Sequence, residues 1–115
     1  MIRGIGCDIC DVTRIRPELV DRILSPQERV LYDGFPSEKR QREFLAGRFA
    51  VKEAILKAAP EKRSILAIAA FIVVNDDDGR PRLEGDPFPG CRTWLSIAHD
   101  GGYAIGMCVI ETLDS

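Results

Sequence analysis

The segment Phe44–Ala58, which reads FLAGRFAVKEAILKA, constrains this chain most because it places charged residues among apolar ones along a helical pattern. Glu53 and Lys57 lie one turn apart on the same side of such a helix. Ala46 and Ala50 fall on that side too, so another backbone could approach closely there. A carboxylate beside an ammonium group on this face suits a metal ion together with a phosphate. It equally suits an ordinary ion pair between residues four apart.

The charge of the chain is unevenly distributed along its length. Residues 38–63 contain eight Lys or Arg and four Asp or Glu, whereas residues 64–115 contain three and eight. The basic block coincides with the helical segment, where Arg48 lies about 140° around the helix from Glu53. This distribution favours an anionic ligand bound by the helix. It does not favour nucleic-acid binding, since the basic residues are not interleaved with aromatic residues that stack on bases.

The order of strand and helix signals predicts an α+β fold. The cap residues Thr13, Ser25 and Ser37 each precede a helical pattern, and Ser25 belongs to a capping box with Glu28. We expect helices at residues 14–24, 26–32 and 38–59, and strands at residues 1–10, 67–75, 80–84, 92–99 and 103–111.

With 115 residues, the chain is expected to form one domain, residues 1–115. No apolar run reaches the roughly 18 residues needed to cross a bilayer, and no secretory leader pattern follows Met1. We therefore expect a cytoplasmic protein without a membrane partner. Cys7 and Cys10 form a C-x-x-C pair, but they would face opposite sides of a strand, so thiols are favoured over a zinc or redox site.

Two further segments carry specific patterns. Residues 4–15 read GIGCDICDVTRI, and residues 95–104 read LSIAHDGGYA. Together with the helical segment, they resemble the signature blocks of the 4'-phosphopantetheinyl transferases, most closely those of the short bacterial holo-acyl-carrier-protein synthase branch. The order, the spacing and the chain length all agree, and three separated blocks must coincide, so this resemblance is far more specific than a lone Gly-x-Gly.

The resemblance implies an antiparallel sheet packed against a long central helix and shorter helices. It implies transfer of the 4'-phosphopantetheine arm of coenzyme A to a serine of an apo acyl carrier protein, with release of adenosine 3',5'-bisphosphate and a requirement for Mg²⁺. Asp8 and Glu53 match the two metal-binding carboxylates of the family, and Glu53 could also help deprotonate the serine. Lys57 matches the catalytic lysine that contacts the phosphates of coenzyme A.

Other residues match by the same resemblance. His99, the only histidine, falls on a family histidine near the phosphates of coenzyme A. Arg48 also sits on a family position for coenzyme A binding, and its direction favours the site of a neighbouring subunit or an interface. Arg14 matches the arginine that begins the carrier-docking helix, and Arg22 could help by steering an acidic partner. The resemblance further implies a homotrimer whose active sites are shared between subunits.

The chain departs from the family pattern in two places that matter for function. The predicted docking helix is short, and Pro17, Glu18 and Asp21 dilute its positive charge. After the long helix, residues 58–63 read AAPEKR where the family has a Phe-Gly-Thr-Gly-like turn; Lys62 and Arg63 add charge but no glycine backbone. These departures leave open a second hypothesis, a non-catalytic paralogue that binds coenzyme A or scaffolds a complex. Retention of both carboxylates argues for the enzyme.

Overall fold

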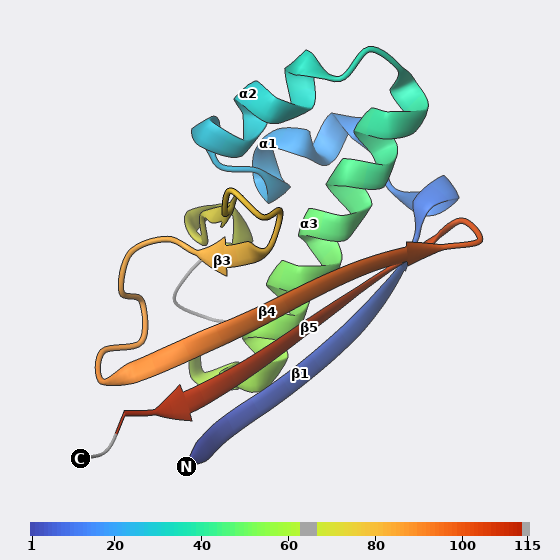
Figure 1. Cartoon of the computed structure of the whole chain (residues 1–115). Helices are drawn as coiled ribbons and strands as arrows, with labels where there is room; N and C mark the ends of the chain where they lie inside the picture. Colours follow the sequence, from blue (N-terminus) through green and yellow to red (C-terminus); the bar gives the residue numbers. More distant parts are fainter. Residues whose placement is uncertain (63–66, 114–115) are drawn as a thin grey trace.

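The computed structural model describes residues 1–62 and 67–113, and its largest element is a three-stranded antiparallel sheet (Figure 1). The strands lie in the order β1-β5-β4 and comprise β1 (Ile2–Asp11), β5 (Tyr103–Thr112) and β4 (Cys91–Asp100). Strands β4 and β5 form the predicted hairpin, whose turn residues Gly101 and Gly102 have φ values of 58° and 87°. A smaller sheet pairs β2 (Val73–Asn75) with β3 (Pro81–Leu83). The predicted α+β class is confirmed.

In the described part of the chain, three α-helices follow β1: α1 (Val20–Ile23), α2 (Pro26–Gly34) and α3 (Glu38–Ala58). The predicted capping box opens α2, because the Ser25 hydroxyl accepts from the Glu28 backbone N–H at 3.3 Å and the Glu28 carboxylate accepts from the Ser25 N–H at 3.0 Å. The predicted cap Ser37 accepts from the Arg40 N–H at 3.2 Å at the start of α3. No helix in the described part of the chain is long and apolar enough to cross a membrane.

The predicted helix over residues 14–24 is wrong. The chain instead forms two short 3₁₀ turns, η1 (Val12–Arg14) and η2 (Pro17–Leu19), followed by the four-residue α1. Asp11 rather than Thr13 caps the first turn, since its carboxylate accepts from the Thr13 N–H at 2.9 Å. The helix is interrupted because Pro17 holds the preceding Arg16 in an extended conformation.

The predicted strand over residues 67–75 is shorter than expected. Its first part contains the 3₁₀ turn η4 (Ile68–Ala70), and only β2 at its end pairs with another strand. A short apolar run of this kind does not distinguish a strand from a short helical turn by periodicity alone.

Helix α3 lies against one face of the main sheet at very short range (Figure 1). The strands allow this approach because three inward-facing positions carry no side chain, namely Gly4, Gly6 and Gly106. A Cβ atom at Gly6 would lie 1.9 Å from the carbonyl oxygen of Ala54, and one at Gly106 would lie 2.3 Å from the backbone nitrogen of Val51. The backbones of helix and strands are therefore in direct contact.

The opposite face of the main sheet is apolar and uncovered by any described element. Cross-strand pairing puts six large side chains on this outer face: Ile5, Ile9, Trp94, Tyr103, Ile105 and Met107. Each of them is at least 39% exposed. Exposed apolar patches of this kind usually mark an interaction surface.

We expect the Gly6→Ala variant to be less stable than the wild type, by about 1–3 kcal/mol or more, because the new methyl group would overlap the backbone of α3. Urea unfolding followed by circular dichroism measures the difference. Gly34→Ala is the matched control, since nothing lies within 4 Å of a Cβ atom at Gly34. Equal stability of Gly6→Ala and the control would contradict the close contact.

Candidate active site

Asp8 on β1 meets α3 at its C-terminal half. The side chain of Asp8 points to the same face of the sheet as Gly6, two residues earlier, and so faces the helix. The Lys57 ammonium donates to Asp8 Oδ1 at 2.9 Å and to the carbonyl oxygen of Cys7 at 3.0 Å. Glu53 is half-buried one turn earlier on α3. The structure thus brings together the three residues that the sequence assigned to metal and phosphate chemistry.

Lys57 contacts β1 in addition to lying one turn from Glu53 on its own helix, so the structure adds a partner to the helix pair that the sequence left open as an alternative. Its resolved hydrogen bond runs across to Asp8, and this contact is the main reason why the pKa of Lys57 is raised. The charge of Glu53 raises the pKa of Lys57 as well, as a smaller contribution. Lys57, which is exposed, therefore stays protonated well above neutral pH and can face an anion.

The donor set of this cluster fits a hard divalent cation that is completed by a substrate. The described residues contain no group of three or more His, Cys, Asp or Glu side chains placed to hold a metal on their own. Mg²⁺ commonly uses only one or two protein carboxylates, while phosphates and waters supply the remaining oxygens. Asp8 and Glu53 meet that requirement only when a phosphate-bearing ligand is also present.

A pocket of about 380 Å³ lies on the other side of α3, between the helix, β4 and the small sheet. Three basic side chains line it, those of Arg40, Arg48 and His99. The rings of Phe35 and Phe44, with centroids 5.3 Å apart, also line the pocket. Such a combination of cations and aromatic rings suits an anion that carries a flat ring.

His99 lies at the end of β4, next to the N-terminal half of α3. Its Nε2 is 2.8 Å from the backbone carbonyl oxygen of Glu43, and a Cβ atom at Gly47 would lie 3.0 Å from the same nitrogen. His99 is therefore held against the helix at the pocket. It belongs to the pocket side of α3 and not to the Asp8 side.

Arg48 lines the pocket as well, on a side of α3 that is turned away from Glu53. It is only 4% exposed, and its Nε donates to Glu28 Oε2 at 3.2 Å. Its guanidinium also stacks over the ring of Phe44, 4.5 Å from the centroid. Arg48 thus reaches the pocket as part of a buried network within its own chain, whereas the sequence indicated only its direction on the helix.

The predicted docking arginines lie on a different surface. Arg14 in η1 and Arg22 in α1 are both exposed. The two nearby acids have other partners, because Glu18 pairs with Arg16 at 2.9 Å and Asp21 pairs with Arg29. These two acids therefore pair with arginines other than the predicted docking residues.

The segment after α3 forms the 3₁₀ turn η3 (Pro60–Lys62) in place of a glycine turn. Lys62 lies over the ring of Phe88, with Nζ 5.8 Å from its centroid, and Glu61 pairs with Arg3 at 2.7 Å. Arg63, the other charge predicted to compensate, lies outside the described residues.

Sequence reasoning missed three residues that shape the pocket side. Arg40 and Asn75 line the pocket, and Glu28 binds both Arg48 and Lys52. Glu28 was recognised only as a capping residue. Two basic residues four apart on a mostly apolar helix could have indicated a buried acidic partner.

The sequence of this chain matches a known protein family. The model of the 4'-phosphopantetheinyl transferase superfamily matches residues 4–108. A "Holo-[acyl-carrier-protein] synthase" from Petrotoga mobilis is 38% identical over 118 residues, which cover 96% of this chain and 97% of the relative. The protein of the same name from Staphylococcus saprophyticus is 37% identical with 96% and 99% coverage.

Solved structures similar to this chain come from the same family. The holo-(acyl-carrier-protein) synthase of Bacillus anthracis, in complex with CoA (3',5'-ADP), superposes with a TM-score of 0.82 at 37% identity and covers 97% of this chain and 98% of its own. The Neisseria meningitidis holo-[acyl-carrier-protein] synthase gives a TM-score of 0.82 at 26% identity, with 97% and 100% coverage. The chain therefore belongs to the 4'-phosphopantetheinyl transferase superfamily and, within it, to the holo-[acyl-carrier-protein] synthases.

Proposed function

We propose that this protein transfers the 4'-phosphopantetheine arm of coenzyme A to a serine of an apo acyl carrier protein and releases adenosine 3',5'-bisphosphate. The observation that carries the proposal is the meeting of Asp8, Glu53 and Lys57 beside α3 in a chain of this family. Two carboxylates and a cation at one place suit a pyrophosphate bound together with a divalent metal. A protein that only bound coenzyme A would have little need of both carboxylates.

Each residue of the cluster has a role in this proposal. Lys57 binds a phosphate oxygen as a compact positive charge and reduces the repulsion between the pyrophosphate and the incoming oxygen. Glu53 takes the proton of the carrier serine, directly or through a water molecule. Asp8 and Glu53 would hold Mg²⁺, which supplies charge stabilisation to the phosphates when bound.

The pocket beside His99 would take the adenosine 3',5'-bisphosphate part of coenzyme A. Arg40, Arg48 and His99 offer cationic or hydrogen-bonding groups to phosphate, and Phe35 and Phe44 offer flat apolar contact. The relative from Bacillus anthracis was solved with CoA (3',5'-ADP). The pocket volume of about 380 Å³ lies within the usual range for small-ligand sites.

The two halves of the proposed site open on opposite sides of α3. Asp8 and Lys57 face the β1 side, whereas Gly47 of the helix touches His99 and Ile97 of β4. Between these two sides, the backbone of α3 is in direct contact with the sheet at Gly4, Gly6 and Gly106. We therefore propose that one coenzyme A molecule binds to Asp8 of one copy and to the pocket of a neighbouring copy.

The uncovered face of the main sheet provides a surface for such an assembly. Its six exposed apolar side chains extend across all three strands and are continuous through the cross-strand pairs, such as Ile9 with Ile105. A cyclic homotrimer would bury this face of every copy and place each Asp8 cluster beside a neighbour's pocket. We propose this trimer, with acyl carrier protein docking at Arg14 and Arg22.

We further propose that residues 1–115 act as one domain in the cytoplasm. All four cysteines are free thiols, namely Cys7, Cys10, Cys91 and Cys108. Free thiols are usual in a reducing compartment.

The transfer itself is tested by intact mass spectrometry of an apo acyl carrier protein incubated with the protein, coenzyme A and Mg²⁺. We expect the carrier to gain the mass of one phosphopantetheine arm, and EDTA to prevent the gain. No gain with several carrier proteins, together with retained binding of coenzyme A, would contradict the transferase and support the binding-only paralogue.

We expect Asp8→Asn to lower kcat/KM by roughly 100-fold or more, because it removes a negative charge from the metal-phosphate site. The fold should persist, since the replacement is isosteric and Asp8 is only partly buried. Steady-state transfer rates at several Mg²⁺ concentrations provide the measurement. Asp77→Asn, in an exposed turn, is the control, and equal rates for the two variants would refute the role of Asp8.

We expect the wild type to be a trimer by light scattering coupled to size exclusion, and Ile9→Glu to dissociate it. A charge at this position would be buried without a partner against neighbouring copies. Val30→Glu is the control, because Val30 is 72% exposed on α2, away from the sheet. A monomeric wild type, or a trimeric Ile9→Glu variant, would argue against assembly through this face.

A further inference from the structure

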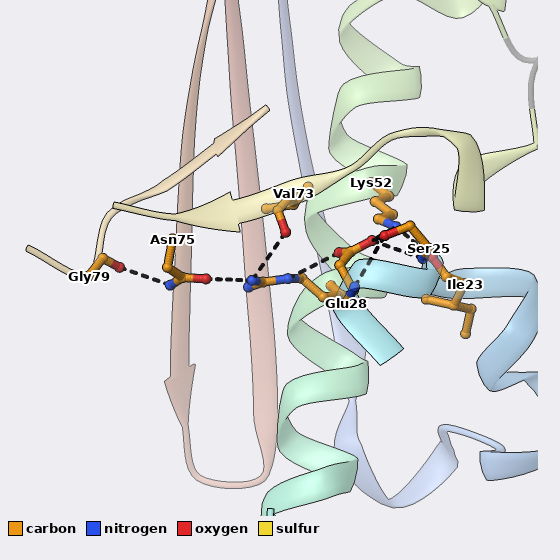
Figure 2. Close-up of polar contacts among 8 residues, drawn as sticks. Ile23, Ser25, Glu28, Lys52, Val73, Asn75 and Gly79 are labelled. Atoms are coloured by element: carbon orange, nitrogen blue, oxygen red, sulfur yellow. Dashed lines mark hydrogen bonds and ion pairs between the residues drawn. The ribbon is translucent and has the colours of Figure 1, made fainter. Parts of the chain in front are cut away.

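Glu28 of α2 is the centre of a buried polar network beside the pocket (Figure 2). Only 1% of its surface is exposed. Its Oε1 accepts from the Lys52 ammonium at 2.6 Å and from the Ser25 hydroxyl at 2.9 Å. Its Oε2 accepts from Arg48 Nε at 3.2 Å. One carboxylate therefore pairs with two cations from α3 and also accepts a hydrogen bond from Ser25, the cap of its own helix.

The other atoms of the Arg48 guanidinium are also fixed. Its Nη2 donates to the side-chain oxygen of Asn75 and, at 3.4 Å, to the carbonyl oxygen of Val73 (Figure 2). Phe44 covers one face of the guanidinium plane. Contacts from α2, β2 and α3 thus define one orientation for a side chain that lines the pocket.

Lys52 completes the network without reaching the pocket. Its ammonium is 0% exposed and donates to Glu28 and to the carbonyl oxygen of Ile23 at 2.6 Å. Burial lowers the pKa of Lys52 and of Arg48, and the Glu28 carboxylate opposes both shifts. Every buried side-chain nitrogen and oxygen among the described residues has a hydrogen-bond partner, so the network is complete.

We propose that Glu28 is a positioning residue for substrate binding: it orients Arg48 so that the guanidinium presents a preformed binding group to an anionic part of coenzyme A in the pocket. This inference rests on the proposed function. Glu28 itself does not line the pocket and acts through Arg48. Preorganisation of this kind improves binding because the side chain needs no ordering when the ligand arrives.

The test uses Glu28→Gln, which keeps the size of the side chain and removes its charge. We expect the dissociation constant for adenosine 3',5'-bisphosphate, measured by calorimetry, to rise roughly 10-fold, as for the loss of one charge-assisted hydrogen bond. The KM for coenzyme A should rise by a similar factor while kcat changes little. An unchanged or lower dissociation constant would overturn the proposal. A wild type that binds no adenosine 3',5'-bisphosphate would instead overturn the proposed function.

A double-mutant cycle separates positioning from a general structural role. In an Arg48→Met background, Glu28→Gln should have no further effect on the dissociation constant, because the residue through which it acts is absent. Additive losses would overturn the proposal. Ser25→Ala is the matched control: it removes another partner of the same carboxylate and should lower stability while it leaves the dissociation constant unchanged. A rise for Ser25→Ala equal to that for Glu28→Gln would also overturn it.

A measurement on the wild type keeps the proposal testable if Glu28→Gln does not fold. The Arg48 Nε–H, held by Glu28, should give a slowly exchanging NMR signal, assigned by its loss in Arg48→Met. Addition of adenosine 3',5'-bisphosphate should shift this signal while its exchange stays slow. Absence of a shift under saturating ligand, or fast exchange in the free protein, would contradict the preformed orientation.

Discussion

The direct backbone contact between α3 and the strands β1 and β5 is the constraint on which the rest of this structure depends. It exists because glycines on the strands face alanines on the helix, so that no side chain separates Gly6 from Ala54. Asp8 follows Gly6 by two residues and therefore meets the same helix, where Lys57 lies one turn beyond Ala54. The close packing of α3 on β1 and the position of the Asp8–Lys57 cluster both follow from the way in which the inward-facing residues of β1 are aligned with the helix.

The same contact divides the chemistry of the chain into two halves. The side of α3 that faces β1 carries the carboxylates and Lys57, which are partly exposed and can exchange partners. The pocket side instead contains cations held by a buried carboxylate, Glu28. Buried charges that are fully paired are rigid, and breaking them is costly, so this half is suited to fixed recognition of an anion. The partly exposed half is suited to a metal ion and a reacting phosphate.

Much of this arrangement could be predicted from the sequence. The capping signals at Ser25 and Ser37 gave the starts of two helices, and the three signature blocks indicated both the family and the residues that meet beside α3. Local signals were enough for the helix starts because each cap joins residues only three positions apart. The assignment of roles to those residues remains a prediction.

Other features depend on contacts between distant segments and could not be predicted. The ion pair of Lys57 with Asp8 joins residues 49 apart, and that of Lys52 with Glu28 joins residues 24 apart. The expected helix at residues 14–24 failed for a local reason that was visible, since Pro17 lies within it. The strand expected at residues 67–75 is shorter than predicted because an apolar run fits a short helical turn equally well.

In the proposed trimer, each active site combines the Asp8 cluster of one copy with the pocket of another. Mixing two inactive variants, Asp8→Asn and His99→Ala, after demonstrated subunit exchange tests it most directly. Random reassembly of equal amounts into trimers should restore about a quarter of the wild-type sites, because each mixed trimer contains one site with both halves intact. Recovery of transfer activity near that level would support the account. No recovery in verified mixed trimers would contradict it.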